Sequence, residues 1–566
     1  MRRPFIWILS LAVVAMIAAA LWSARARVPE NAVLVLELNG DLEEAPPRDL
    51  LSQWNARGPA LPALLLLLDM AAADARVQAV LLHVGPLSVG YARIQELRDA
   101  LSRVRSAGKR VIALVDETSL NATRELYLAS AADKTFIDPA SLAPLAGIAG
   151  QYLHFAGFFE KIGVAWQVSR VGEYKSAVEQ FAAREMSPKA REMTDELLDG
   201  IFGQIVEGIA AGRGIDVAGV RALIKATPGT PEELVAAKLA DGVADRHDVL
   251  EKAGLAGASE LEAEKYQRVD PSSLGLRNGP TIALVFGEGA IVEERGRGFQ
   301  RVFAADETVK ALDAAAKDDE IRAVVLRINS PGGGAQPSDK IWRAVSRVRA
   351  KKPIVVSMAD YAASGGYYVA SGANAIVAEP ATLTGSIGVF FLRPSFSGLY
   401  QKLEIGSELI ERGPYAGVSG GDRPLTDEQQ TRTDSFIASS YGEFLSRVSA
   451  GRGISTEAVD ALGRGRVWLG SAAFARKLVD EVGGLRTAVE RARKEAGIEN
   501  EPDPVRLILP EPRTPTEQLR QLIRGDARSH LLHALLPEGL PFAFALDWLP
   551  LDGALAYLPP YWIEIH

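Results

Sequence analysis

The residues with the clearest chemical potential lie in the stretch Asp360–Tyr368, which has Ser364 at its centre. The apolar run Ile354–Met358 precedes this stretch and predicts a buried strand, and a helical pattern follows it. A helix N-terminus offers free N–H groups, and the pair Gly365-Gly366 lets a substrate backbone approach closely. The pattern is therefore typical of a nucleophilic serine beside an oxyanion site. A helix N-cap serine followed by two packing glycines is the structural alternative.

A serine nucleophile needs a base, and the composition limits the choice. Cysteine is absent, which excludes disulfides, thiolate catalysis and cysteine-ligated zinc. None of the six histidines lies near Ser364 in the sequence, so we interpret them as packed or solvated side chains. A lysine acts as a base only when it is neutral, and lowering its pKa from about 10.4 to about 7–8 by burial costs roughly 3–4 kcal/mol. The sequence shows no tight acidic metal cluster, and Gly332–Gly334 lacks the ending of a phosphate-binding loop.

The chain contains two related halves. Four short stretches recur in the same order: Ala79–Val84 with Ala323–Ile328, Ser102–Arg105 with Ser346–Arg349, Ala211–Ile215 with Ala450–Ile454, and Lys238-Leu239 with Lys477-Leu478. Conserved order and spacing favour a duplicated fold over chance similarity of helical composition. We predict one domain over 28–255, a polar and turn-rich linker over 256–278, and a second domain over 279–495.

Each half alternates short apolar runs with helical patterns. In the second half the runs predict strands over Thr281–Phe286, Ala323–Ile328, Ile354–Met358 and Ala375–Ala378, with helices over Thr308–Ala316 and Lys340–Ala350. Such alternation predicts an α/β fold in which helices cover a parallel sheet. Ligands of such sheets bind at the carboxyl ends of the strands, where the glycine-rich loop Asn329–Gly334 is expected.

The two halves differ at the residues that matter for chemistry. A register of 241 residues places Ser364 opposite Thr123, and it places an arginine and a glutamate opposite the glycine pair. The same register places Lys175 of the first half opposite Ala416 of the second. Each half thus keeps one of the two groups, which predicts a single Ser/Lys site built from both halves. Ordinary drift between repeats, with Lys175 as a solvated surface lysine, is the alternative.

The two ends of the chain differ in composition from its body. Phe5–Trp22 is an uncharged apolar run near the lower length limit for a membrane-spanning helix, so we interpret 1–27 as a retained membrane anchor. A cleaved signal peptide is the alternative, and both interpretations place the body outside the cytoplasm. The tail, 496–566, is rich in proline and aromatic residues, and its prolines argue against a long membrane-spanning helix. The net charge of −8 does not favour a nucleic-acid partner.

The motifs resemble those of the signal peptide peptidase A family, also called protease IV, in its long tandem form. The matching stretches are Asn329–Gly333, Asp360–Tyr368, Thr384–Val389 and Gly172–Ala177. The resemblance covers the anchor and both repeats and weakens after about residue 496. It implies two tandem ClpP/crotonase-like domains in a membrane-bound serine endopeptidase. Such an enzyme degrades cleaved signal peptides and other extended apolar peptides without metal, ATP or other cofactor.

The resemblance also implies a role for individual residues. Carried over by position, Ser364 would be the nucleophile, Lys175 the general base, and Ser386 the residue that orients the lysine. Gly333 and Gly365 would supply the oxyanion N–H groups, with the glycine before Gly333 as an alternative donor. The family further implies a homotetramer in the bacterial inner membrane, with a single N-terminal anchor and the body on the periplasmic side.

Two other functions compete with the peptidase. One is a crotonase-like acyl-CoA hydrolase or transferase, because the same fold handles coenzyme A thioesters. The other is a membrane scaffold with an inactive site. The export segment and the complementary serine and lysine argue against both.

Overall fold

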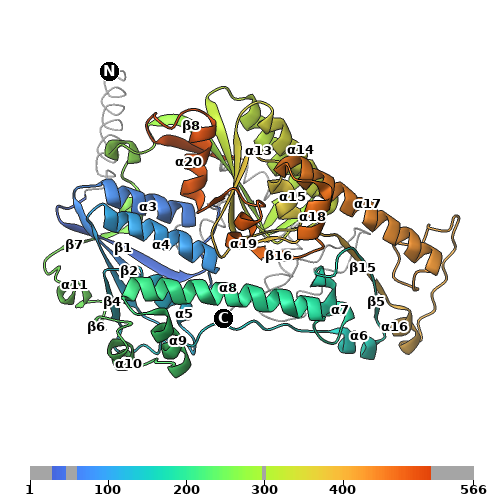
Figure 1. Ribbon diagram of the computed structural model, residues 1–566, viewed down its shortest axis with the longest axis horizontal. Coiled ribbons are helices and arrows are strands. Elements are labelled where there is room, and N and C mark those ends of the chain that lie inside the picture. The colour runs from blue at the N-terminus through green and yellow to red at the C-terminus, as the bar shows by residue number, and fades with distance from the viewer. Residues whose placement is uncertain (1–27, 46–59, 296–300, 511–566) are drawn as a thin grey trace, which may run out of the picture.

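The computed structural model describes residues 28–45, 60–295 and 301–510 (Figure 1). The apolar run Phe5–Trp22 and the tail after residue 510 lie outside the described residues. Within the described ranges, no helix has both the length and the apolar character needed to cross a membrane.

The first half is built on a six-stranded parallel sheet in the order β6, β4, β3, β2, β1, β7. The strands are β1 (Ala32–Gly40), β2 (Val77–Leu87), β3 (Arg110–Val115), β4 (Lys134–Ile137), β6 (Gly242–Val243) and β7 (Ser259–Glu262). The central strands are buried at most positions because helices cover both faces of a parallel sheet. The segment 256–278 is more than the expected linker, since β7 pairs with β1 and closes an otherwise open sheet edge.

The second half repeats this plan with the order β16, β14, β12, β11, β8, β18, and β13 links β12 to β17. Its strands are β8 (Gly279–Glu288), β11 (Ile321–Ser330), β12 (Ile354–Ala363), β13 (Ala375–Ala378), β14 (Leu383–Gly385), β16 (Val467–Leu469), β17 (Glu481–Val482) and β18 (Pro504–Leu509). All pairs are parallel except that of β14 with β16. The predicted α/β alternation is confirmed, and three of the four predicted strands extend further than expected. β18 comes from the expected tail and covers the edge of β8.

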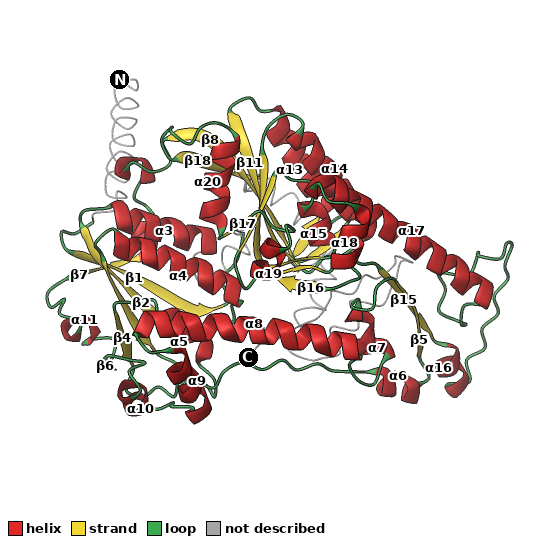
Figure 2. Ribbon diagram, in the orientation of Figure 1, coloured by secondary structure: helices red, strands yellow, loops and turns green. Residues whose placement is uncertain are grey.

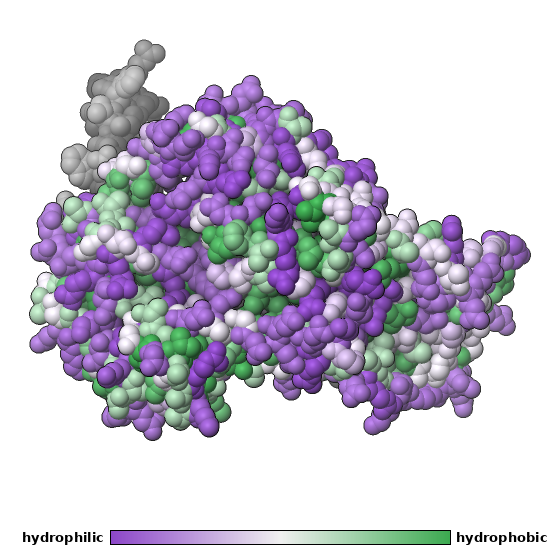
Figure 3. All heavy atoms as spheres, in the orientation of Figure 1, coloured by the Kyte–Doolittle hydropathy of each residue, from purple (hydrophilic) through white to green (hydrophobic). Residues whose placement is uncertain are grey.

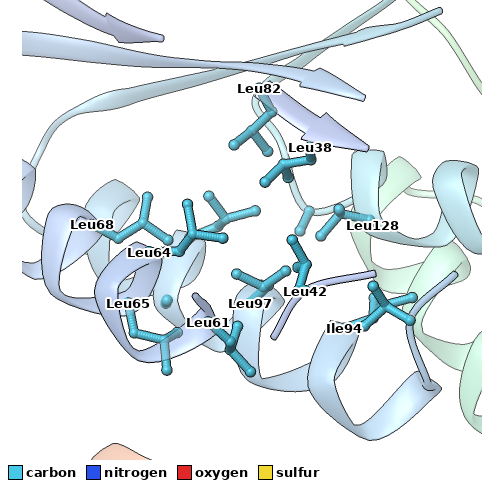
Figure 4. Close-up of a cluster of buried hydrophobic side chains, with 14 of the residues drawn as sticks. Leu38, Leu42, Leu61, Leu64, Leu65, Leu68, Leu82, Ile94, Leu97 and Leu128 are labelled. Atoms are coloured by element: carbon cyan, nitrogen blue, oxygen red, sulfur yellow. The ribbon is translucent and has the colours of Figure 1, made fainter. Parts of the chain in front are cut away.

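Helices from both halves fill the space between the two sheets. The helices α3 (Leu61–Ala73) and α4 (Tyr91–Ser106) share one hydrophobic core with α20 (Leu485–Glu495) and with side chains of β8, β11 and β12. Figure 4 shows leucines of α3 and α4 gathered beneath Leu38 of β1 and Leu82 of β2. On the other face of the second sheet lie α13 (Ala305–Lys317), α14 (Ala335–Arg349) and α15 (Gly365–Ala370). The shared core fixes the position of each half relative to the other.

A second contact between the halves lies outside both main sheets. The strand β5 (Ala165–Arg170) of the first half pairs antiparallel with β15 (Phe390–Ser395) of the second (Figure 2). The long helices α8 (Pro188–Arg213) and α17 (Asp427–Arg452) occupy equivalent places in the repeat, and each ends at a left-handed glycine, Gly214 or Gly453. On the face drawn in Figure 3, hydrophilic side chains predominate, and the hydrophobic ones form several small patches, some of them near the middle. The two halves therefore contact each other both through the shared core and through the β5–β15 pair.

Candidate active site

Ser364 lies between the end of β12 at Ala363 and the start of α15 at Gly365. Its backbone has φ +53° and ψ −117°, a conformation that costs a non-glycine residue about 1–3 kcal/mol. Two hydrogen bonds hold this turn: the Ser364 N–H donates to the Gly385 carbonyl (2.8 Å), and the Tyr368 N–H donates to the Ser364 carbonyl (2.8 Å). The side chain stays partly exposed. The sharp turn thus presents Ser364 Oγ at the carboxyl end of the sheet.

Lys175 comes from the first half, and its Nζ lies 3.0 Å from Ser364 Oγ. The residue is only 2% exposed, and burial lowers the pKa of its amine to about 7. Nζ also donates to the carbonyl (3.1 Å) and to the hydroxyl (2.9 Å) of Ser386. A neutral amine has two N–H donors and one lone pair, so these three neighbours match it when the Ser364 hydroxyl donates to Nζ. The geometry therefore fits a neutral lysine that accepts the serine proton.

Ser386 follows β14 and has a left-handed backbone with φ +50°. Its N–H donates to the carbonyl of Arg466 (2.7 Å), which holds the turn in place. Both its hydroxyl and its carbonyl face Lys175 Nζ. Ser386 is thus in a position to orient the amine toward Ser364.

The loop Pro331–Gly334 follows β11 and lies against Ser364. A Cβ on Gly332 would come within 2.8 Å of Ser364 Cβ and 2.9 Å of the Gly365 nitrogen, so this position requires glycine. The Gly332 N–H donates to Ser330 Oγ (3.1 Å) and is therefore occupied. Within the described ranges, the N–H groups of Gly333 and Gly365 have no protein acceptor. These two N–H groups are the better candidates for binding an oxyanion.

The equivalent place in the first half is closed by its own side chains. Arg124 donates to the carbonyl of Leu87 (2.6 Å), and the Leu87 N–H donates to Glu125 (2.8 Å), so both side chains hold the neighbouring loop. Thr123 donates to Asn121 Oδ1 (2.7 Å). Ala416, the counterpart of Lys175, lies exposed in a turn. Among the described residues, the two aligned places thus differ, and the required groups come together at the one on the seam.

Beneath this site the halves are joined by buried charges. Arg327 of β11 is 1% exposed and forms ion pairs with Glu44 (2.9 Å) and Glu96 (2.7 Å) of the first half. Asp360, four residues before the nucleophile, pairs with Arg93 of α4. Such pairs are geometrically demanding, so they restrict the relative position of the two halves.

An open cleft of about 670 Å³ lies beside the lysine loop. The cleft is lined by Val168–Val171 at the end of β5, by residues between Val178 and Ala183, and by residues of α17 near Ile437. Arg170 lines the cleft, pairs with Glu179 (3.1 Å) and donates to the Lys175 carbonyl (3.2 Å). The cleft thus connects with the backbone that carries the lysine.

Sequence reasoning did not single out the groups that surround the lysine stem. Gly388 and Gly465 lie directly against Lys175, and a Cβ on Gly388 would come within 3.2 Å of Lys175 Cδ. Gly388 lies in a motif already noted, whereas Gly465 lies in the stretch Gly463–Trp468, whose two glycines were the available signal. No described histidine hydrogen-bonds to Ser364; His83, for example, pairs with Glu37 (2.6 Å) and Asp116 (3.3 Å).

Comparison with known proteins matches this chain to a peptidase family in both halves. The model of Peptidase family S49 matches residues 103–258 and 346–499. The Arabidopsis thaliana protein named "Serine protease SPPA, chloroplastic" is 32% identical over 514 residues, which cover 89% of this chain and 74% of that protein.

Two bacterial proteins named "Protease 4" are also similar. The one from Haemophilus influenzae is 33% identical and the match covers 70% of this chain and 66% of that protein. The one from Salmonella typhi is 34% identical, with 69% of this chain and 65% of that protein covered. The chain thus spans about two thirds of the length of these bacterial relatives.

Proposed function

The chain belongs to peptidase family S49 and is a serine protease, and we propose that Ser364 and Lys175 form its catalytic pair. In this proposal Ser364 is the nucleophile, Lys175 is the general base, and Ser386 orients the lysine. Gly333 and Gly365 donate their N–H groups to the oxyanion. The proposal rests above all on one observation, the 3.0 Å separation of Lys175 Nζ from Ser364 Oγ in a buried setting that lowers the pKa of the amine to about 7.

The acylation step follows from this arrangement. Lys175 Nζ takes the Ser364 proton while Oγ attacks the scissile carbonyl carbon, and the carbonyl π electrons move onto the oxygen. The oxyanion is stabilised by the N–H groups of Gly333 and Gly365, and loss of one such donor lowers kcat by about 10²–10³. The protonated Lys175 then gives its proton to the leaving amine as the C–N bond breaks. This leaves an acyl ester on Ser364 and a neutral lysine.

Deacylation reuses the same groups. The neutral Lys175 takes a proton from water as the water oxygen attacks the ester carbonyl, and the same N–H groups bind the second oxyanion. The lysine then returns the proton to Ser364 Oγ as the ester bond breaks. A base with a pKa near 7 suits both directions of transfer at neutral pH.

We propose cleaved signal peptides and other extended apolar peptides as substrates. The nucleophile lies at a seam between the halves, and the lining of the nearby cleft combines apolar side chains such as Val168, Val178 and Ile437 with polar and charged ones. An extended chain can place its backbone against the glycine loops there, whereas a folded domain cannot.

We further propose that 1–27 anchors the protein in the bacterial inner membrane, with the body on the periplasmic side. The support is the uncharged run Phe5–Trp22 in the sequence. We also propose a homotetramer, as the resemblance of the motifs implies, and the exposed apolar side chains of Leu403, Ile405, Ile410 and Phe436 are available for subunit contacts. Light scattering of the detergent-solubilised chain would measure the subunit number, and a monomer would contradict the tetramer.

Separate substitutions of the two groups test the catalytic pair. Ser364→Ala and Lys175→Ala should each lower kcat on a quenched-fluorescent signal-peptide substrate by about 10⁴ or more, because the two groups act as a unit. Lys310→Ala, which removes an exposed lysine of α13, serves as the control and should retain the wild-type rate. Cleavage at the wild-type rate by either of the first two variants would refute the assignment.

A further inference from the structure

A short loop of the second half touches the first half where the lysine is carried. Residues Gly463–Trp468, here called the 463–468 loop, comprise the connection after α18 (Thr456–Leu462) and the first two residues of β16. The Tyr174 N–H donates to the Arg464 carbonyl (3.1 Å). A Cβ on Gly172 would lie 2.6 Å from Arg464 Cα, so the two segments meet backbone to backbone. The backbone just before Lys175 is therefore held by the 463–468 loop.

Gly465 lies closest to the lysine itself. It has φ +83°, and its N–H donates to the Ile387 carbonyl (2.8 Å). A Cβ at this position would lie 2.6 Å from both Cα and Cβ of Lys175. Across the lysine stem, a Cβ on Gly388 would lie 2.9 Å from Gly465 Cα. Two glycines thus form a narrow slot for the start of the lysine side chain, and no side chain fits at either position.

Arg466 in the same loop contacts Ser386, which is a partner of the lysine, and Tyr174, which precedes the lysine in the chain. Its carbonyl accepts the Ser386 N–H (2.7 Å), while its guanidinium stacks over the Tyr174 ring at 4.4 Å. The guanidinium also forms ion pairs with Glu192 (3.0 Å) and Glu196 (2.6 Å) of α8. One residue therefore links the turn of Ser386, the lysine loop and a long helix of the first half.

The repeat provides an independent argument. The register of 239 residues that aligns Lys238 with Lys477 places Ala226 opposite Gly465 and Thr227 opposite Arg466. The first-half counterpart of the 463–468 loop thus has neither the glycine nor the arginine. In the second half, the segment that the register of 241 residues aligns with the lysine loop carries Ala416 in place of a lysine. Of the two glycines that form the slot, Gly465 therefore has no glycine counterpart in the aligned segment of the first half.

We infer that the 463–468 loop positions the general base, and that Gly465 and Arg466 set the separation of Lys175 Nζ from Ser364 Oγ. This inference rests on the proposed roles of Ser364 and Lys175. A shift of about 1 Å in a catalytic group can lower the rate about 10²-fold. Moving the lysine stem out of the slot also admits water to the amine, which returns the lysine toward its ordinary basicity.

Gly465→Ala in the full-length, detergent-solubilised chain tests the inference. With a quenched-fluorescent signal-peptide substrate, kcat should fall about 10²-fold while KM changes little, and the inflection of the kcat–pH profile should move above its wild-type position. Gly453→Ala is the matched control, because Gly453 also has a left-handed backbone (φ +66°) but no atom lies within 4 Å of its added Cβ. The control should lower thermal stability and leave the pH inflection unchanged.

The outcomes separate the inference from the proposed function. If the wild type does not cleave the peptide, or if Ser364→Ala cleaves it as well as the wild type, the proposed function fails. If cleavage depends on Ser364 but Gly465→Ala keeps the wild-type kcat and pH inflection, the positioning inference is overturned.

A second variant covers the case in which Gly465→Ala does not fold. Arg466→Gln removes the ion pairs to Glu192 and Glu196 but leaves the backbone contact to Ser386. It should lower kcat about tenfold and shift the pH inflection upward, and Arg466→Lys, which keeps the charge without the flat stack, should recover part of the loss. An unchanged inflection in Arg466→Gln would overturn the inference.

Discussion

A carboxylate placed beside Lys175 should move the pH profile of the enzyme in a defined direction. The ring of Phe390 on β15 lies 6.0 Å from Lys175 Nζ and is partly exposed, so Phe390→Glu brings a negative charge near the amine without replacing a catalytic group. The carboxylate stabilises the ammonium form of Lys175 and therefore raises the lysine pKa. Only the neutral amine acts as a base, so activity near neutral pH should fall.

The size of the effect follows from the distance. Two unit charges about 6 Å apart interact by about 2.8 kcal/mol at an effective dielectric constant of about 20. At about 1.4 kcal/mol per unit, this raises the lysine pKa by about 2 units, from about 7 to about 9. The neutral fraction of Lys175 at pH 7 then falls from about one half to about 1%, which predicts an approximately fiftyfold loss of rate.

The assay is the pH dependence of kcat/KM on a quenched-fluorescent signal-peptide substrate between pH 5 and pH 10. Wild-type activity should rise about tenfold per pH unit below about pH 7 and then level off. The kcat/KM of Phe390→Glu should level off near pH 9 instead, and at that pH it should recover most of its loss relative to the wild type. Phe390→Gln has a side chain of nearly the same shape without the charge, so its inflection should stay near pH 7.

The result that refutes this reasoning is equally specific. If Phe390→Glu and Phe390→Gln share one inflection, the titrating base is not within reach of a charge at position 390. Lys175 would then not be the group that the pH profile reports. Measuring the pH profiles at high salt provides a check. The rise in the Lys175 pKa caused by Phe390→Glu should persist there, because salt only weakly screens the interaction of a charge with a buried amine.

Two further predictions concern stability. Because the folded protein binds no proton at Lys175 above about pH 7 while the unfolded chain stays protonated to about pH 10.5, the unfolding free energy rises with pH across this window. Lys175→Met removes this titration. Its gain in Tm over the wild type, equivalent to at most about 5 kcal/mol, should be fully present below about pH 7 and should shrink between pH 7 and pH 10.5 in thermal melts; a gain independent of pH would contradict it. Arg327→Met removes the nearest positive charge from two buried carboxylates, Glu44 and Glu96, and should lower the unfolding free energy by about 3–5 kcal/mol in urea titrations. The control Arg347→Met removes an exposed pair with Asp313 and should cost less than about 1 kcal/mol, and equal losses in the two variants would contradict the importance of burial.

Much of the fold could be predicted from the sequence, because most of its strands and helices have characteristic patterns of neighbouring residues. The strands of the second half are apolar runs of the right length, and the helices between them have apolar residues at helical spacing. The repeat was detected from short similar stretches, such as Ala79–Val84 and Ala323–Ile328, which occur in the same order in both halves. The strands β7 and β18 were missed, because each forms only where a distant sheet edge is open to receive it.

Some features of the candidate site could likewise be predicted from the sequence, and others depend on the tertiary structure. The sequence by itself determined which half carries the serine, which half carries the lysine and where glycines allow close approach, because residue identity and repeat register record these facts. Only the tertiary structure decided that Lys175 Nζ and Ser364 Oγ lie 3.0 Å apart, that the Gly332 N–H is already occupied, and that Gly465 confines the lysine stem. These are properties of segments far apart in the chain that meet at one seam. The basicity of the lysine belongs to this second group, since a lowered pKa comes from the water that packing excludes and not from the residue itself.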